Sequence, residues 1–229
     1  MPTPDNDSNA ATFDATSPKA WSHTIGGGAD RALLVYLILV DDTVQPGPTY
    51  NSVAMSLLGS RQWEFGGSQH KIWLFELHEA SLPAAGSYDV SFTHTAIAVC
   101  GGAFSASVVH QTTPFGSVAS ANGTASPATV DVTAAVNDLV VDGVTWRLNG
   151  SSGTVGGGQT ELWNLVSGNY FLGQSREDGA PSVTMSWTSG GTSDTWGIIA
   201  VALKPAGAGA GATGGAFAQT ILRSRLRTW

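Results

Sequence analysis

Three glutamates lie near one another in the sequence and have the chemistry that glycosidases use. Those enzymes act with two carboxylates on one face of a site, and same-face residues of a strand are two or four positions apart. Glu76 and Glu79 are three apart, so a regular strand directs them to opposite faces. Glu64 and Glu76 become neighbours only if a hairpin forms around Gly66 and Gly67. A hydrolase is therefore only a residual alternative.

Other acidic and imidazole side chains provide a weak case for a metal. Four aspartates are predicted near strand ends, where oxygen ligands for calcium can gather: Asp30, Asp41, Asp42 and Asp194. Five histidines show no spacing typical of metal ligands: His23, His70, His78, His94 and His110. No Asp-x-Asp-x-Asp-Gly loop occurs. We expect no metal and no cofactor, with a structural calcium as the alternative.

Motifs of nucleophilic and phosphate chemistry are missing from the sequence. There is no Gly-x-Ser-x-Gly turn, and the glycine runs at 26–28 and 156–158 lack the Gly-Lys-Ser/Thr of a phosphate loop. The single cysteine, Cys100, lies in an apolar run and is predicted to be a small buried side chain. We therefore expect a protein that is not an enzyme and has no catalytic residue.

Eight tryptophans are the remaining candidates for a site. Sugar-binding modules stack sugar rings on exposed aromatic side chains, whereas large aromatics also fill the core of a glycine-rich sandwich. We favour the core for most of them. Trp63, which has polar Gln62 and Glu64 beside it, is predicted to be exposed and is the candidate glycan contact.

The elements that must position these residues are short strands. Runs that alternate in polarity or are rich in β-formers are bounded by Gly-Gly, Gly-Pro or Asn-Gly turns. They lie at 20–25, 32–41, 53–64, 71–78, 87–94, 96–109, 128–133, 138–148, 160–165, 169–175, 182–188 and 195–203. No segment between 12 and 204 keeps a helical apolar stripe. The prediction is an all-β, antiparallel two-sheet sandwich over residues 12–205.

One internal similarity links the start and the end of this body. Residues 21–30 and 186–194 each read as a strand, a Gly-Gly turn and an aspartate, and a fully apolar strand follows each of them. Strands that are apolar on both faces are central ones. We predict that these two hairpins lie side by side.

The two ends of the chain differ from the body. Residues 1–11 are polar and contain proline, which predicts a flexible N-terminal arm. Residues 206–215 form a Gly/Ala linker. Residues 216–229 are basic and amphipathic and are predicted to dock on a partner. The docking residues are Phe217, Ile221, Leu222, Arg223, Arg225, Leu226, Arg227 and Trp229.

Charge separates the body from this docking segment. The net charge is −7, yet residues 1–215 carry 17 acidic and seven basic residues, a formal charge of −10, while the last segment carries three arginines. An acidic body argues against a nucleic-acid partner. We also expect no membrane partner, because the longest apolar run, 32–40, is too short to cross a bilayer. The N-terminal residues show no basic stretch followed by an apolar run, as an export signal would have.

Several ordered motifs resemble a group of jelly-roll-like β-sandwich domains that occur in tailed-phage virion proteins and predicted bacterial surface proteins. The resemblance covers about residues 12–205. The motifs are Trp21-Ser-His-Thr with Gly26 to Gly28, Leu33-Leu-Val, Thr49-Tyr-Asn-Ser-Val-Ala-Met55, Ile72-Trp-Leu, Gln111-Thr-Thr-Pro-Phe-Gly116, Asp138-Leu-Val-Val-Asp142, Gln159-Thr-Glu-Leu-Trp163, Ser182-Val-Thr-Met-Ser-Trp187 and Trp196-x-x-x-x-Val-Ala-Leu-Lys-Pro205. The resemblance implies a jelly-roll-like fold and no catalytic residue.

Together these features predict a structural virion protein of a tailed bacteriophage, either a head decoration or fibre protein or a tail-associated one. Its partners would be other virion proteins of the capsid or tail, and a homo-oligomer such as a trimer suits that role. The alternative is a carbohydrate-binding module at the cell surface or outside the cell. In that case the partner is a host-surface glycan.

Overall fold

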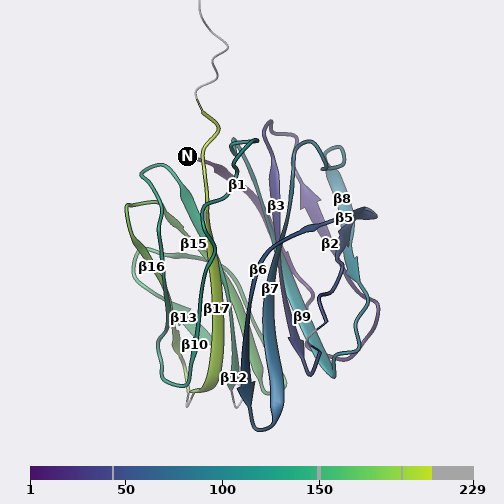
Figure 1. The fold of residues 1–229 in the computed structure, drawn as a ribbon, viewed down its shortest axis with the longest axis vertical. Helices are drawn as coiled ribbons and strands as arrows, with labels where there is room; N and C mark the ends of the chain where they lie inside the picture. Colours follow the sequence, from purple (N-terminus) through teal and green to yellow (C-terminus); the bar gives the residue numbers. More distant parts are fainter. Residues whose placement is uncertain (43, 149–150, 192, 208–229) are drawn as a thin grey trace, which may run out of the picture.

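The computed structural model describes residues 1–42, 44–148, 151–191 and 193–207, which form seventeen strands and no helix (Figure 1). The all-β sandwich is confirmed, but it contains four antiparallel sheets rather than two. We name the sheets by their half of the chain and their place in the stack, so that each half contributes one inner and one outer sheet.

The first half of the chain builds the first inner and outer sheets. The first inner sheet contains, in order, β1 (Thr3–Asn9), β9 (Ala98–Ser107), β3 (Ala32–Val40), β7 (Ser68–His78) and β6 (Ser56–Phe65). The first outer sheet contains β2 (Lys19–Ile25), β8 (Gly86–Phe92), β4 (Thr49–Tyr50) and β5 (Val53–Ala54). Only Met55 separates β5 from β6, so one extended segment passes from the outer sheet to the inner one.

The second half repeats this order of strands, except that its outer sheet has three strands rather than four. The second inner sheet contains β10 (Ala119–Gly123), β17 (Ser193–Leu203), β12 (Leu139–Leu148), β15 (Tyr170–Asp178) and β14 (Thr160–Ser167). The second outer sheet contains β11 (Ala128–Val132), β16 (Val183–Ser189) and β13 (Gly153–Val155). Both halves follow the jelly-roll order, in which the chain winds between two sheets. The protein is a tandem pair of jelly-roll units.

The four sheets stack as layers, with the inner sheets in the middle and an outer sheet on each side (Figure 1). The hydrophobic cluster of the first unit continues into side chains of the second inner sheet, among them Val141, Leu172 and Ile199. A second cluster fills the space between the second inner and outer sheets. The inner sheets are therefore covered on both faces, and the outer sheets on one.

Burial of the strands follows from these positions. Every residue of β3 is buried, because a strand in a doubly covered sheet must be apolar on both faces. In contrast, β2 alternates between buried and exposed residues, as expected for a sheet with one wet face. The prediction that 32–41 is a central strand is confirmed by its pairing with both β7 and β9.

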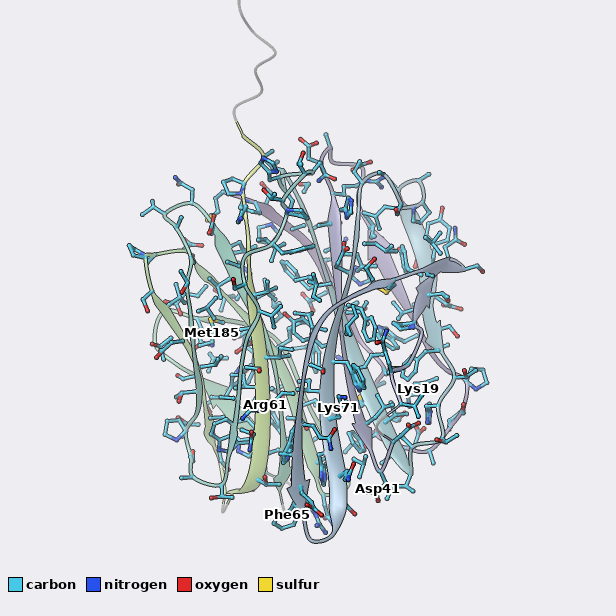
Figure 2. The ribbon with its side chains drawn as sticks, in the orientation of Figure 1. Lys19, Asp41, Arg61, Phe65, Lys71 and Met185 are labelled. Carbon is cyan, nitrogen blue, oxygen red and sulfur yellow. The ribbon has the colours of Figure 1, made fainter. Side chains whose placement is uncertain are left out.

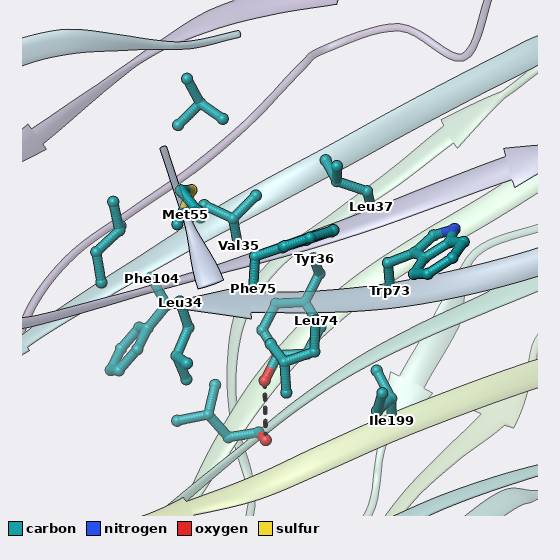
Figure 3. Packing of buried hydrophobic residues seen from close by; sticks show 14 of the residues in the cluster. Leu34, Val35, Tyr36, Leu37, Met55, Trp73, Leu74, Phe75, Phe104 and Ile199 are labelled. Carbon is teal, nitrogen blue, oxygen red and sulfur yellow. Dashed lines mark hydrogen bonds between the residues drawn. The ribbon is translucent and has the colours of Figure 1, made fainter. Parts of the chain in front are cut away.

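Aromatic side chains over glycines allow the inner sheets to approach each other. A methyl group on Gly143 of β12 would overlap the ring of Tyr36 of β3, whose hydroxyl donates to the carbonyl of Val141 at 3.1 Å (Figure 3). Trp163 of β14 covers Gly102 in the same way. These contacts cross between the two units, so each unit completes the core of the other.

Two further predictions about the chain are wrong. Residues 1–11 do not form a free arm, because β1 is an edge strand that pairs with β9 from Thr3 opposite Ser107 to Asn9 opposite Gly102. The hairpins containing 21–30 and 186–194 do not lie side by side, because β2 and β16 belong to opposite outer sheets. The repeat that does exist is one of strand order.

Replacement of Gly197 by alanine tests the contact between the inner sheets. A methyl group there would overlap the ring of Trp63, so we expect a loss of about 1–3 kcal/mol in the free energy of unfolding. Urea unfolding measures this change. Gly157→Ala is the control, because no atom lies within 4 Å of its added methyl group. Equal stability of the two variants would contradict the close packing.

Candidate functional site

The last described residues form the base from which residues 208–229 continue. We call residues 204–206 the tail root. The connector, residues 108–118, joins the two units and flanks the tail root on both sides. Its His110 N–H donates to the carbonyl of Lys204 at 2.9 Å, and Ala206 N–H donates to the carbonyl of Val108 at 2.7 Å. Lys204 N–H in turn donates to the carbonyl of Pro114 at 2.8 Å. Backbone hydrogen bonds therefore fix the tail root to the body.

A side-chain network ties the connector to the first unit. Gln111 accepts a hydrogen bond from the backbone N–H of Glu79 at 3.0 Å and donates to the carbonyl of Val109 at 2.8 Å. Glu79 forms an ion pair of 2.7 Å with Arg31, and the arginine's hydrogen bonds lower the pKa of Glu79. The connector is thus held at the start of β3 and the end of β7, and it holds the tail root in place.

The tail root and the first strand lie at the same pole of the molecule. Figure 1 shows the N-terminus beside the end of the described chain. At the opposite pole lie the β6–β7 turn and the end of β3, where Phe65 and Asp41 are labelled (Figure 2). The pole with Phe65 and Asp41 is therefore the end of the body that lies farther from residue 207 (Figure 2).

The predicted docking residues lie outside the described residues. They are Phe217, Ile221, Leu222, Arg223, Arg225, Leu226, Arg227 and Trp229. Docking through this segment therefore stays a prediction. What the structure adds is the position and the backbone fixation of residues 204–206, which precede the linker to this segment.

The predicted exposure of Trp63 is wrong. This residue is 6% exposed, its ring stacks on His70 with the centroids 5.6 Å apart, and it covers Gly197 of the other unit. Since β6 is an edge strand with one buried face, Gln62 and Glu64 point outward while Trp63 points inward. Trp63 cannot act as an exposed glycan contact in this conformation.

The glutamates do not form the paired site that a hairpin would create. Glu64 lies opposite Gln69, and Glu76 lies opposite Ser56, so the two carboxylates are at different positions along the β6–β7 pair. Glu76 instead contacts His78 at 3.1 Å. Glu79 is committed to Arg31. Glu76 and Glu79 therefore each have a structural partner.

Two of the four aspartates considered for calcium accept hydrogen bonds from neighbouring loops and turns. Asp41 accepts hydrogen bonds from Ser68 and from the N–H of Gln69, and Asp42 accepts two from Thr95. Among the described residues, no group of three or more His, Cys, Asp or Glu side chains is placed to hold a metal ion. The side chain of Asp194 lies outside the described set. Within the same part of the chain, no helix is long and apolar enough to cross a membrane.

Cys100 is buried, as predicted, in the first inner sheet. Burial raises the pKa of its thiol to about 12. The thiolate that reacts with oxidants and electrophiles is therefore almost absent at neutral pH.

A buried carboxyl in the second unit escaped the sequence analysis. Asp142 of β12 is fully buried and accepts hydrogen bonds from the N–H and hydroxyl of Ser175 at 2.8 and 2.9 Å, and from the indole N–H of Trp187 at 2.8 Å. Burial raises its pKa to about 7, against the effect of these donors. The only signal in the sequence was an aspartate between the apolar residues of 139–146.

The first unit contains a buried histidine with the opposite shift. His23 of β2 is 1% exposed and contacts the Ser8 hydroxyl at 2.9 Å. Burial lowers its pKa to about 4, while the charge of Asp5 acts in the other direction. Burial therefore disfavours the charged form of Asp142 in the second unit and of His23 in the first.

Comparisons with known proteins add no relative. No protein-family model matches the chain, and neither a curated protein nor a solved structure is similar to it.

The two buried groups predict opposing effects of pH on stability. Between about pH 4 and 7 the folded state keeps a proton on Asp142 that the unfolded state has lost, so this group reduces stability as pH rises. Between about pH 4 and 6.5 the unfolded state protonates His23 and the folded state does not, so this group increases stability as pH rises.

Single substitutions separate these effects. In urea unfolding from pH 4.5 to 6.5, Asp142→Asn should become more stable as pH rises and His23→Gln less stable, each by up to about 1.4 kcal/mol per pH unit. The wild-type profile should lie between the two. Identical slopes for both variants would show that neither group titrates as the structure indicates.

Proposed function

We propose that this protein is a structural component of a tailed-phage virion that is attached through residues 216–229 and displays its body on the particle. The phage assignment rests on the motif resemblance over residues 12–205. The mode of action rests on the tail root. In this proposal the function is attachment and surface display, without catalysis.

The observation that carries the mode of action is the backbone fixation of residues 204–206. A strand extension held from both sides fixes the pole of the body at which the chain leaves, because the connector is hydrogen-bonded to residues 204–206. A Gly/Ala linker alone would leave the body free to rotate over its length. Residues 206–215 have that linker composition, so anchoring of residues 216–229 would keep this pole nearest to the partner while the body could still rotate.

Charge supports docking to a partner surface that is acidic or apolar. Arg223, Arg225 and Arg227 follow a body that is acidic overall, so the segment and the body have opposite signs. Screening weakens such contacts in high salt, since the Debye length falls from about 10 Å at 0.1 M to about 3 Å at 1 M. The apolar residues of the segment would give a contribution that salt does not remove.

Virion incorporation tests the proposal. We expect mass spectrometry of gradient-purified particles to detect the full chain, and deletion of residues 208–229 to reduce its amount at least tenfold. Reversal of all three tail arginines to glutamate should also reduce it strongly. Arg61→Glu, an exposed charge reversal on the body, is the matched control and should be incorporated normally.

Two results would contradict the proposal. Absence of the full chain from every purified particle would exclude a virion component. Normal incorporation of the deletion variant would show that the body, and not the C-terminal segment, makes the attachment.

A further inference from the structure

The first outer sheet has a polar hollow on its solvent face. Its volume is about 480 Å³, within the range of small-molecule sites. We call it the β4–β8 hollow, because it lies over β4, β8 and the turn after β4. The lining residues are Thr49, Asn51, Ser52, Ser87, Tyr88, Asp89 and Ser91. None of them was singled out by the sequence as a site residue.

The polar groups of this hollow are largely unused by the fold. The carboxylate of Asp89, the amide of Asn51 and the hydroxyl of Ser52 form no hydrogen bond or ion pair with the described part of the chain, although Asp89 and Asn51 are linked through their backbones at 3.2 Å. By comparison, Asp131 on the second outer sheet accepts a hydrogen bond from Thr184. The hollow thus presents donors and acceptors that the fold does not use.

The turn that borders the hollow has an unfavourable residue in it. Tyr50 and Val53 pair across a two-residue hairpin whose central residues, Asn51 and Ser52, have φ of 49° and 64°. Asn-Gly is the favoured sequence for such turns, because both central positions need a positive φ. Asn51 tolerates this conformation, but serine in place of glycine at 52 is strained. Position 52 therefore carries a serine side chain although the backbone conformation there favours glycine.

The lining chemistry selects the class of ligand. One carboxylate, one amide and several hydroxyls are the groups that exchange hydrogen bonds with a polyhydroxylated molecule. No lysine or arginine lines the hollow, which disfavours phosphate and other anions, and its only aromatic residue, Tyr88, is half-buried against Tyr50. We propose that the β4–β8 hollow binds a saccharide, with Asp89 accepting hydrogen bonds from sugar hydroxyls and Asn51 and Ser52 completing the contact.

The position of the hollow suits binding from a free surface. It lies on the first outer sheet, whereas the tail root continues β17 of the second inner sheet (Figure 1). One shallow polar site gives weak affinity, so several copies on one scaffold would be needed for tight attachment. The inference does not depend on the chain being a virion component.

Binding to an array of bacterial surface polysaccharides and their repeating units tests the inference with the full chain, in EDTA. The oligosaccharide that binds is then titrated into isotope-labelled protein. We expect amide shifts at residues 49–53 and 87–91. Asp89→Ala should weaken binding at least tenfold, whereas Asp131→Ala, an exposed acid on the other outer sheet, should bind as the wild type does.

Ser52→Gly separates a binding role from a structural one. Relief of the strained turn should raise the melting temperature by about 2 °C, while loss of the hydroxyl should weaken saccharide binding severalfold. A merely structural serine would give the first effect without the second.

Four outcomes would overturn the inference. They are absence of any array signal for the wild type, amide shifts confined to other surfaces, equal saccharide binding by Asp89→Ala, and equal saccharide binding by Ser52→Gly. Self-association that Asp89→Ala abolishes, without saccharide binding, would also overturn it and identify the hollow as a contact between copies.

Discussion

The contact between the two inner sheets is the constraint on which the molecule depends. Sheets that face each other normally pack about 10 Å apart, a space that side chains must fill. Here Tyr36, Trp63 and Trp163 fill it over glycines of the opposite unit. In each contact the ring belongs to one unit and the glycine to the other. Neither jelly-roll unit therefore has a complete core alone. The two units repeat one strand order, and each depends on the other for its packing.

The mutual packing of the two units explains which strands are apolar on both faces. The buried titratable groups lie in other parts of the core. The central strand β3 lies between two cores and is buried along its whole length. His23 lies between the inner and outer sheets of the first unit, and Asp142 with Ser175 and Trp187 lies between those of the second. Their opposite pKa shifts act against each other on stability in the mildly acidic range.

Much of the fold could be predicted from the sequence, because strand periodicity and glycine turns are local signals. The N-terminal strand could not, since β1 is held by backbone pairing and by Asp5, which accepts hydrogen bonds from Gly26 and Ser105, rather than by apolar side chains. The exposure predicted for Trp63 is wrong because its polar neighbours point to the solvent-exposed face of an edge strand, whereas Trp63 points to the buried face. The duplication was missed because strand order repeats while residues do not. The β4–β8 hollow depends on φ angles and unused side-chain groups, which no spacing reveals.

The proposed mode of action joins these features. A stack of four sheets has its tail root fixed at one pole by the connector, so anchoring the C-terminal segment would keep that pole nearest to the particle. Cryo-electron microscopy of purified particles tests this directly. The proposal predicts density for the body with the connector and tail root toward the particle and the β6–β7 turn outward. Density with the β6–β7 turn against the particle would contradict it.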